Sequence, residues 1–510
     1  MNKLKPLPEE WTGLLNNEQK EAIENINGPL LIIAGAGSGK TRVLTYRYAH
    51  LIRTYGIKFE NVLAITFTNK AANEMKDRIS ELLNLELSPK WISTFHSLCV
   101  KMLRIHGHLI GFNNNFTIYD QSDSTKLIRN CMRDSDIDTK QYSPKRIQAH
   151  ISSLKNQRIL PGEAVEFAQS FFDVKVAEIY SSYQKKLMLA NSMDFDDLLI
   201  KAVELLETSD KSLNYWSSKF QYIMIDEYQD TNMVQYRLVE LLASKHKNIC
   251  VVGDSDQSIY AFRGADIRNI EEFESDFKDA KVISLEKNYR SSQKILDIAN
   301  AVISNNPRKK EKKLWTDNDE GLDVNLVEFN SERDESRWIA EQINKLLKDK
   351  AFTEIAIFYR TNNQSRLFEE ELRKLSLNYK VVGNVRFYDR KEIKDILAYL
   401  NYLINPEDTV SFERILNVPK RGIGESTIQK LRDYANKNEI SLSKSIENLD
   451  TINNLSDRVK KQINNFKEII NDLKSFALQG PSVTISKTLE LTGYKDELVK
   501  EGTLDSQMRL

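Results

Sequence analysis

A glycine-rich segment that ends in a lysine and a threonine is the first group of residues with evident chemical capacity. Residues 34–41 read Ala-Gly-Ala-Gly-Ser-Gly-Lys-Thr. Glycines let successive backbone N–H groups surround phosphate oxygens at the positive end of a helix. Lys40 would bridge the β- and γ-phosphates of a nucleotide, and the Thr41 hydroxyl would ligate Mg²⁺. The usual P-loop pattern begins with glycine, and this segment begins with Ala34, so a chance glycine turn is the alternative.

Two further groups of polar residues follow apolar runs. Asp226 and Glu227 come directly after Tyr222–Ile225, and two acids at the carboxyl end of a buried strand suit metal-assisted phosphoryl transfer. Asp226 would hold Mg²⁺ through water, and Glu227 would orient or activate the attacking water. Gln257 follows the apolar run at 249–252 and could sense a γ-phosphate. The alternatives are a solvated acidic turn and an ordinary polar loop.

The elements that must position these residues are indicated by the flanking sequence. Leu30–Ile33 is a short apolar run typical of a buried strand, and the residues after Thr41 have helical spacing. Strand, glycine-rich turn and helix is the context that a P-loop needs.

Length and composition set wider limits. A chain of 510 residues, 41% hydrophobic and 29% charged, indicates an ordinary globular protein of three or four domains. With 73 basic and 73 acidic residues, any surface that binds nucleic acid must be local. No apolar run approaches the roughly 18 residues of a membrane span, and the charged N-terminus does not resemble a secretory signal, so a cytoplasmic location without membrane contact is expected. Cys99, Cys131 and Cys250 lie far apart, which favours buried reduced thiols over a zinc site or disulfides.

In chain order, these segments resemble the superfamily 1 DNA helicases of the UvrD/Rep/PcrA type. The runs DEYQDTN at 226–232 and GDSDQSIY at 253–260 are near-identical to the family's patterns, and Ala34 is what the family places at the start of its P-loop. The resemblance implies an α/β fold of RecA-like P-loop NTPase motor domains, each built on a parallel sheet, with inserted helical subdomains. It also implies an ATP-dependent DNA helicase that uses ATP and Mg²⁺, moves 3′ to 5′ on single-stranded DNA, and serves repair or replication.

The same resemblance assigns residues to the nucleotide. Residues 15–19 resemble the adenine-reading segment, in which Gln19 would bond the base. Residues 286–292 resemble the start of the second motor domain, in which Tyr289 would stack on adenine and Arg290 would reach the γ-phosphate. The expected nucleotide-binding residues are Gln19, Ala34, Gly35, Ala36, Gly37, Ser38, Gly39, Lys40, Thr41, Arg42, Tyr289 and Arg290. The expected catalytic residues are Lys40, Glu227, Gln257 and Arg290, and the expected metal ligands are Thr41 and Asp226.

Other segments resemble the family's DNA contacts. Phe262 stands where many relatives have tryptophan, and Ala261 where many have arginine, so stacking should persist with a smaller face. A Gly-Ile-Gly turn at 422–424 resembles a helix–hairpin–helix contact to duplex DNA, with a plain helix-linking turn as the alternative. The basic run at 308–313 is expected to be a solvated face. The expected DNA-binding residues are Thr66, Phe67, Asn69, Thr94, Phe95, His96, Tyr260, Phe262, Arg263, Arg360, Asn362, Lys420 and Arg421.

The family plan predicts how the chain is divided. Residues 1–111 and 194–280 would form the first RecA-like motor domain, 112–193 an inserted helical subdomain, 281–387 the first part of a second motor domain with strands near 324–329, 354–359 and 379–383, and 388–510 an incomplete helical accessory domain. Two later family motifs, one carrying a second arginine for the γ-phosphate, are not found. We therefore expect a truncated chain that binds ATP·Mg²⁺ but hydrolyses it poorly, since such an arginine contributes about 10³–10⁵ in rate.

Rival functions share many of these motifs. A translocase that displaces proteins without unwinding has all of them, and an ATP-regulated module that binds single-stranded DNA would need no turnover. A plain P-loop kinase is disfavoured because it would have no use for the aromatic DNA segments. The expected partners are single-stranded DNA, junctions of single- and double-stranded DNA, and loading proteins of repair or replication, for a monomer or weak dimer.

Overall fold

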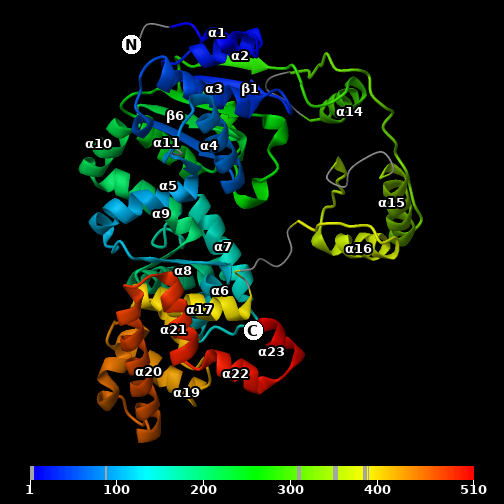
Figure 1. Cartoon of the computed structure of the whole chain (residues 1–510). Helices are drawn as coiled ribbons and strands as arrows, with labels where there is room; N and C mark the ends of the chain where they lie inside the picture. Colours follow the sequence, from blue (N-terminus) through cyan, green and yellow to red (C-terminus); the bar gives the residue numbers. More distant parts are fainter. Residues whose placement is uncertain (1–4, 87–88, 307–311, 348–353, 383–387, 389) are drawn as a thin grey trace. The chain divides into compact units, whose positions relative to one another are not determined.

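The computed structural model describes most of the chain and divides it into two compact units. The described residues are 5–86, 89–306, 312–347, 354–382, 388 and 390–510. One unit comprises residues 1–321 and 398–497, and the other comprises 322–397 and 498–510. Figure 1 shows the labelled elements along the chain.

A parallel sheet of six strands is the centre of the first unit, which confirms the expected α/β P-loop fold class. The apolar runs expected as strands are strands, because a parallel sheet buries both of its faces. In spatial order the strands are β3 (Ile92–Thr94), β2 (Val62–Thr66), β6 (Tyr222–Ile225), β7 (Ile249–Gly253), β1 (Leu30–Ala34) and β8 (Lys281–Leu285).

Strand register brings the candidate residues to one edge of this sheet. Ile33 pairs with Gly253 between β1 and β7, and Ile225 pairs with Val251 between β6 and β7. All three strands run in the same direction, so the segments that follow them leave at the same edge. The glycine-rich segment, the acids after β6 and the loop after β7 are therefore neighbours.

The sixth strand extends the first sheet past the expected boundary at residue 280. β8 pairs with β1 from Leu30 opposite Lys281 to Ala34 opposite Leu285. The apolar alternation of this run is satisfied by a ladder with β1, so the first sheet continues past the boundary. Residues 286–292 consequently begin beside the glycine-rich turn.

Helices cover both faces of the sheet because neighbouring strand residues point to opposite sides. Leu31 and Ile225 belong to the core on one face, and Leu30 and Met224 to the core on the other. The first core is completed by α5 (Phe95–His106), α9 (Phe195–Thr208), α10 (Asp210–Lys219) and α11 (Met233–Ala243). The second is completed by α1 (Glu9–Thr12), α2 (Asn17–Glu24), α3 (Lys40–Arg53) and α4 (Asn69–Leu83).

Residues 112–193 are mostly helical and have a core of their own, which includes Ile128, Ile151 and Tyr180. Two short strands, which the sequence did not predict, pair in parallel at the ends of this segment. These elements are β4 (Thr117–Tyr119), α6 (Gln121–Asp134), α7 (Pro144–Asn156), α8 (Phe171–Leu189) and β5 (Ser192–Asp194).

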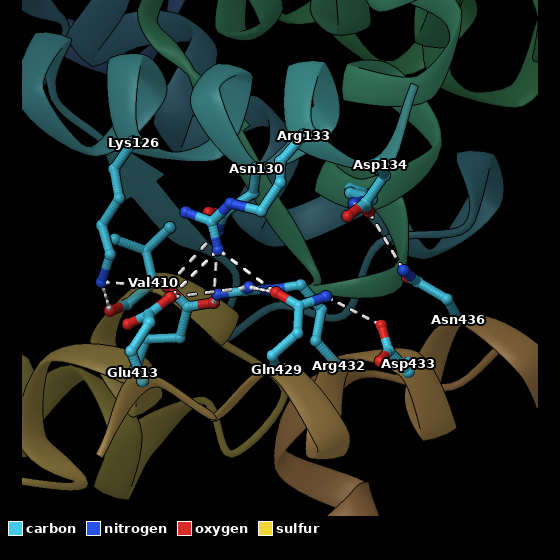
Figure 2. A network of polar contacts seen from close by, with 12 residues as sticks. Lys126, Asn130, Arg133, Asp134, Val410, Glu413, Gln429, Arg432, Asp433 and Asn436 are labelled. Atoms are coloured by element: carbon cyan, nitrogen blue, oxygen red, sulfur yellow. Dashed lines mark hydrogen bonds and ion pairs between the residues drawn. The ribbon is translucent and has the colours of Figure 1, made fainter. Parts of the chain in front are cut away.

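Residues 398–497 are helical and pack against α6 through a polar network (Figure 2). The Glu413 carboxylate pairs with Lys126 at 3.2 Å and with Arg432 at 2.8 Å, and it accepts from Asn130 Nδ2 at 3.2 Å. Burial opposes its ionisation, but the two cations outweigh burial and lower the pKa of Glu413. The helices are α17 (Lys391–Ile404), α18 (Thr409–Ile415), α19 (Glu425–Lys437), α20 (Asp457–Ala477), α21 (Pro481–Leu491) and α22 (Tyr494–Glu501).

The second unit differs from the expected strand–helix alternation. α15 (Glu332–Leu346) and α16 (Ser365–Lys374) pack through Ala340, Ile343 and Leu372. Among the described residues, the runs at 324–329, 354–359 and 379–382 form no strand. A strand needs a hydrogen-bonded neighbour, and the side chains of Leu326 and Phe358 are 100% and 94% exposed. Residues 383–387, where the second motor domain was expected to end, lie outside the described residues, and α23 (Leu504–Arg509) is the last helix.

The structure also bears on the expectations for the three cysteines and for membrane-spanning helices. Cys99, Cys131 and Cys250 are all buried, as expected. Within the described ranges, none of the helices combines the length and the apolar character that crossing a bilayer requires.

Candidate nucleotide site and nucleic-acid interface

The glycine-rich turn lies between β1 and α3 and is held from both sides. Gly37 and Gly39 have φ angles of +68° and +91°, which favour glycine. A Cβ at Gly39 would meet Gln19 Nε2 at 2.8 Å, and one at Gly37 would meet Arg290 Cβ at 2.8 Å. The backbone of the turn is thus closely approached by Gln19 and Arg290, which are distant in the sequence and were both expected to bind the nucleotide.

Lys40 is paired with Glu227 across this edge of the sheet. Lys40 Nζ lies 2.8 Å from Glu227 Oε2. Glu227 adopts a left-handed backbone conformation, with φ of +50°, a strained state that clusters at functional sites in non-glycine residues. The turn after β6 therefore aims one carboxylate at the lysine that would bind phosphate.

Asp226 is the buried neighbour of this pair. Burial and the charge of Glu227 raise the pKa of Asp226 to about 7, against the opposing effect of Lys40. A bound divalent cation would favour the ionised carboxylate. The Thr41 hydroxyl at the start of α3 would supply a second oxygen ligand, and an all-oxygen set suits Mg²⁺. The oxygen ligands therefore fit the expected Mg²⁺, and so does the Asp226 carboxylate, whose negative charge Lys40 does not fully balance.

The loop after β7 is tied to the same edge by the side-chain amide of Gln229, which no sequence motif had indicated. Gln229 Nε2 donates to Glu227 Oε2 at 3.0 Å, and Gln229 Oε1 accepts from the Asp254 backbone N–H at 2.9 Å. Gln257 Nε2 in turn donates to Asp254 Oδ2 at 2.6 Å. Gln229 thus links the general-base candidate to the loop that carries the phosphate-sensing candidate.

Residues 286–292 complete the wall around the turn. Buried Asn288 donates from Nδ2 to the Ala36 carbonyl at 2.6 Å, and its Oδ1 accepts from the Arg290 backbone N–H at 2.8 Å. The Tyr289 backbone N–H donates to the Gly37 carbonyl at 2.9 Å, while its ring is half-exposed. Asn288, another residue without a sequence-based role, therefore positions both family-implied residues beside the P-loop.

An aromatic cluster lies a few residues beyond Gln257. The rings of Phe67 and Tyr260 have centroids 4.7 Å apart, and those of Tyr260 and Phe262 are 6.0 Å apart. The Arg263 guanidinium lies 5.4 Å from the Tyr260 ring centroid and 5.6 Å from that of Phe262. These side chains line a groove of about 1040 Å³, and Phe262 is 73% exposed. Stacked aromatics beside a cation are what sequence-tolerant binding of single strands requires.

Comparisons with known proteins agree with this arrangement. The model of the UvrD/REP helicase N-terminal domain matches residues 15–278, and that of the UvrD-like helicase C-terminal domain matches 283–490. The chain belongs to the UvrD/REP helicase family. Relatives named ATP-dependent DNA helicase PcrA, from Staphylococcus aureus (strain NCTC 8325 / PS 47) and Staphylococcus epidermidis (strain ATCC 12228 / FDA PCI 1200), are each 46% identical over 498 residues. The alignment covers 97% of this chain and 68% of each relative.

The remaining nucleotide residues of this UvrD/REP family member lie around the turn. Gln19 is buried, and its Nε2 donates to the Ser38 carbonyl at 3.0 Å, so it supports the P-loop directly. Arg42 is exposed and donates to the Leu14 carbonyl at 3.5 Å. Contact of these two side chains with a nucleotide stays a prediction.

One expected DNA contact conflicts with its position. Phe95 is 5% exposed and packs in the core with α9 and α11, so its ring cannot stack on a base without leaving the core. The family resemblance implied contact between Phe95 and single-stranded DNA, but the first turn of α5 points the ring into the core. His96, one residue later, lies in the groove wall, with its ring centroid 6.1 Å from that of Phe195.

Three further candidates, at the ends of β2 and β3 and at the start of α4, differ in how accessible they are. Thr66 and Thr94 are buried, and Thr94 caps α5 by accepting from Ser97 N–H at 3.3 Å. Asn69 is exposed at the start of α4, and its Oδ1 accepts from Thr94 Oγ1 at 3.4 Å. Only Asn69 of these three presents an exposed side chain to a ligand.

The candidates outside the groove also differ from one another. Arg421 is committed to the fold, because its guanidinium donates to the Ile415 carbonyl at 2.8 Å and to Tyr399 Oη at 2.7 Å. These bonds give Arg421 a structural role, and its expected contact with duplex DNA is left to experiment. Lys420 is exposed beside the turn, and Arg360 and Asn362 are exposed in the second unit.

A buried cluster connects the inserted helices to the DEYQDTN segment at 226–232. Lys155 Nζ lies 2.7 Å from Asp194 Oδ2 and 2.8 Å from Asp197 Oδ1. The next residue, Asn156, accepts at Oδ1 from Asn232 Nδ2 at 2.6 Å. No sequence pattern indicated that Lys155, which lies in a polar helix, would be buried.

Proposed function

We propose that this chain is an ATP-dependent DNA helicase or translocase that moves 3′ to 5′ along single-stranded DNA in repair or replication. The proposal draws on family membership, on the printed names of the Staphylococcus relatives, and on the geometry of the first unit. We further propose a cytoplasmic location and junctions of single- and double-stranded DNA as substrates.

The observation that carries the proposal is the short loop between the two candidate sites. Asp254 and Gln257 lie at the nucleotide edge of the sheet, and Tyr260 and Phe262 form the aromatic cluster only a few residues later. One short stretch of chain therefore connects the edge of the sheet that would bind phosphate with the aromatic residues that would bind bases. A plain nucleotide kinase would have no use for this arrangement.

Each residue at the edge has a distinct task in hydrolysis. Lys40 would exchange Glu227 for phosphate oxygens, which leaves the Glu227 carboxylate available to orient the attacking water. Thr41 and Asp226 would hold Mg²⁺, which neutralises charge on the phosphates. Arg290, fixed by Asn288 beside Gly37, would approach the same phosphates from β8.

The aromatic cluster would hold the strand by stacking. Each stacked base contributes about 1–3 kcal/mol with little dependence on sequence. Alternation between tight and loose grip, linked to nucleotide state, would move the protein along the strand. The direction of travel rests on the family resemblance alone.

A paired binding experiment tests the proposal on the 510-residue chain. Anisotropy of labelled oligo(dT) should report saturable binding, with an affinity that differs between a non-hydrolysable ATP analogue and ADP. No binding of single strands, or equal affinity in both nucleotide states, would refute a nucleotide-coupled motor.

Turnover separates this function from its closest rival. We expect slow steady-state hydrolysis by the 510-residue chain, since the sequence contains one of the two family arginines for the γ-phosphate. Nucleotide-dependent DNA affinity without any turnover would instead favour an ATP-regulated binding module. Robust DNA-stimulated turnover would show that the second arginine is dispensable.

A further inference from the structure

Lys312 belongs to the basic run that the sequence predicted to be a solvated face, but its side chain is only 10% exposed. Its position is set by the segment that follows it. A Cβ at Gly35 of the P-loop would overlap Leu314, and the Leu314 carbonyl accepts from Asn300 Nδ2 at 3.0 Å. Thr316 Oγ1 donates to the Asn288 carbonyl at 2.8 Å. The segment is therefore fixed against the P-loop, and Lys312 lies at its inner end.

The ammonium group of Lys312 is paired at the carboxyl end of β7. It forms ion pairs with Asp254 and, at 3.1 Å, with Asp256. The Asp254 backbone N–H donates to Gln229, and its carboxylate accepts from Gln257. Lys312 is thus connected to the same polar network that joins Glu227 to the loop after β7.

The two lysines are similarly sheltered from solvent, and each is paired with a carboxylate at the same edge of the sheet. Lys40 is paired with Glu227 after β6, and Lys312 is paired with Asp254 after β7, on adjacent strands. Burial and the positive charge of Lys40 lower the pKa of Lys312 to about 8, so the two ammonium groups influence one another. Two cations that converge on one edge, each held by a carboxylate, would be brought together favourably by a polyanion.

We propose that Lys312 is a second phosphate-binding lysine, which exchanges Asp254 and Asp256 for the terminal phosphate of a nucleoside triphosphate. The proposal rests on the proposed function and deepens it. When Lys312 moves to the phosphate, the Asp254 carboxylate loses its paired cation. The same carboxylate accepts a hydrogen bond from Gln257, which lies a few residues before the aromatic cluster. Loss of the γ-phosphate returns Lys312 to the two carboxylates. Lys312 thereby distinguishes a triphosphate from a diphosphate.

Equilibrium titration of the 510-residue chain with fluorescent nucleotides, in the presence of Mg²⁺, tests this assignment. Lys312→Ala should weaken binding of a non-hydrolysable ATP analogue by roughly ten- to a hundredfold, the effect of one charge-assisted hydrogen bond, and weaken ADP less than threefold. Lys313→Ala, at the exposed adjacent lysine, should leave both affinities within twofold of the unaltered chain. Retained ADP affinity also shows that the Lys312 variant is folded.

A double-mutant cycle tests whether Lys312 contacts the phosphate or only neutralises the charges of Asp254 and Asp256. If Lys312 touches the phosphate, Lys312→Ala should still weaken the ATP analogue in an Asp254→Asn, Asp256→Asn background. An effect that vanishes in that background, or that is equal for ATP analogue and ADP, overturns the assignment. If the unaltered chain binds no ATP analogue, or binds it equally after Lys40→Ala, the proposed function itself fails. Binding that depends on Lys40 but not on Lys312 defeats this inference alone.

Discussion

Replacement of Lys155 by methionine should produce one of the largest losses of stability available in the first unit. The Lys155 side chain has 0% exposure and lies within ion-pair distance of both Asp194 and Asp197. Methionine keeps most of the volume and removes the charge. Two buried carboxylates at the start of α9 are then left without their cation.

The size of the loss follows from this geometry. Removal of one partner from a buried ion pair costs about 3–5 kcal/mol, because the remaining charge stays desolvated. With two carboxylates affected, we expect the free energy of unfolding to fall by about 4–5 kcal/mol at pH 8. Lys145→Met, at an exposed position on the same helix, should change it by less than about 0.5 kcal/mol.

The loss should depend on pH in one direction. In the unaltered chain, burial opposes ionisation of Asp194, but Lys155 outweighs burial and lowers the pKa of this carboxyl. Without Lys155, burial and the repulsion between the two carboxylates are no longer opposed by a cation, so the pKa values of Asp194 and Asp197 rise in the folded state. The folded variant then binds more protons than the unfolded chain, and its deficit should shrink as pH is lowered from 8 to 5. Lys155 stays charged throughout this range, because its own pKa is raised by the two carboxylates against the effect of burial.

Urea unfolding followed by intrinsic fluorescence, at pH 8 and pH 5, measures both effects. A deficit below about 1 kcal/mol at pH 8, or a deficit that grows on acidification, would refute the reasoning. Addition of Asp197→Asn to the lysine variant should restore part of the loss at pH 8, since it removes one of the uncompensated charges.

Three other changes have defined outcomes. Tyr260→Ala should weaken oligo(dT) binding by about 1–3 kcal/mol in an anisotropy titration while nucleotide affinity is retained; an equal loss of both would indicate damage to the fold. Arg421→Ala should lower the free energy of unfolding by about 1–3 kcal/mol, since its carbonyl partners lose a donor, and should leave duplex affinity unchanged. Gln229→Leu should leave Glu227 and the Asp254 N–H unpaired, and it should reduce the difference in oligo(dT) affinity between ATP analogue and ADP; an unchanged difference would exclude Gln229 from the coupling.

Local sequence patterns were sufficient for the nucleotide edge. Leu30–Ile33 is apolar throughout and is followed by glycines, so the strand, the turn and α3 follow from short-range chemistry. The acids after β6 were recognised for the same reason. Such patterns identify a residue type at the end of an element, and these ends meet because all the strands are parallel.

Long-range contacts account for what sequence reasoning missed. Lys312 has four other basic residues near it in the run at 308–313, and only its pairing with Asp254 distinguishes it from a solvated lysine. Asn288 and Gln229 act through partners distant in the sequence, such as the Ala36 carbonyl and the Asp254 N–H. Phe95 lies within a motif that implies DNA contact, but the packing of α5 against the sheet turns its ring into the core.

The strands predicted in the second unit were wrong because strand formation there depends on a pairing partner and not only on the apolar pattern. The β8 run resembles those at 324–329 and 354–359 in its apolar content, but β8 has β1 as a neighbour. In the described part of the second unit, the other runs have no such partner. A hydrogen-bond ladder is a property of two segments, and one segment cannot predict it.

The central claim is that Lys40, released from Glu227, holds the phosphates of ATP at the edge of the six-stranded sheet. Titration of the purified chain with a fluorescent ATP analogue and Mg²⁺, before and after Lys40→Ala, tests it most directly, with Lys58→Ala at an exposed site as the matched control. We predict saturable binding that persists in the control and is lost in the Lys40 variant. Absence of binding by the unaltered chain, or identical binding curves for all three proteins, would contradict the claim.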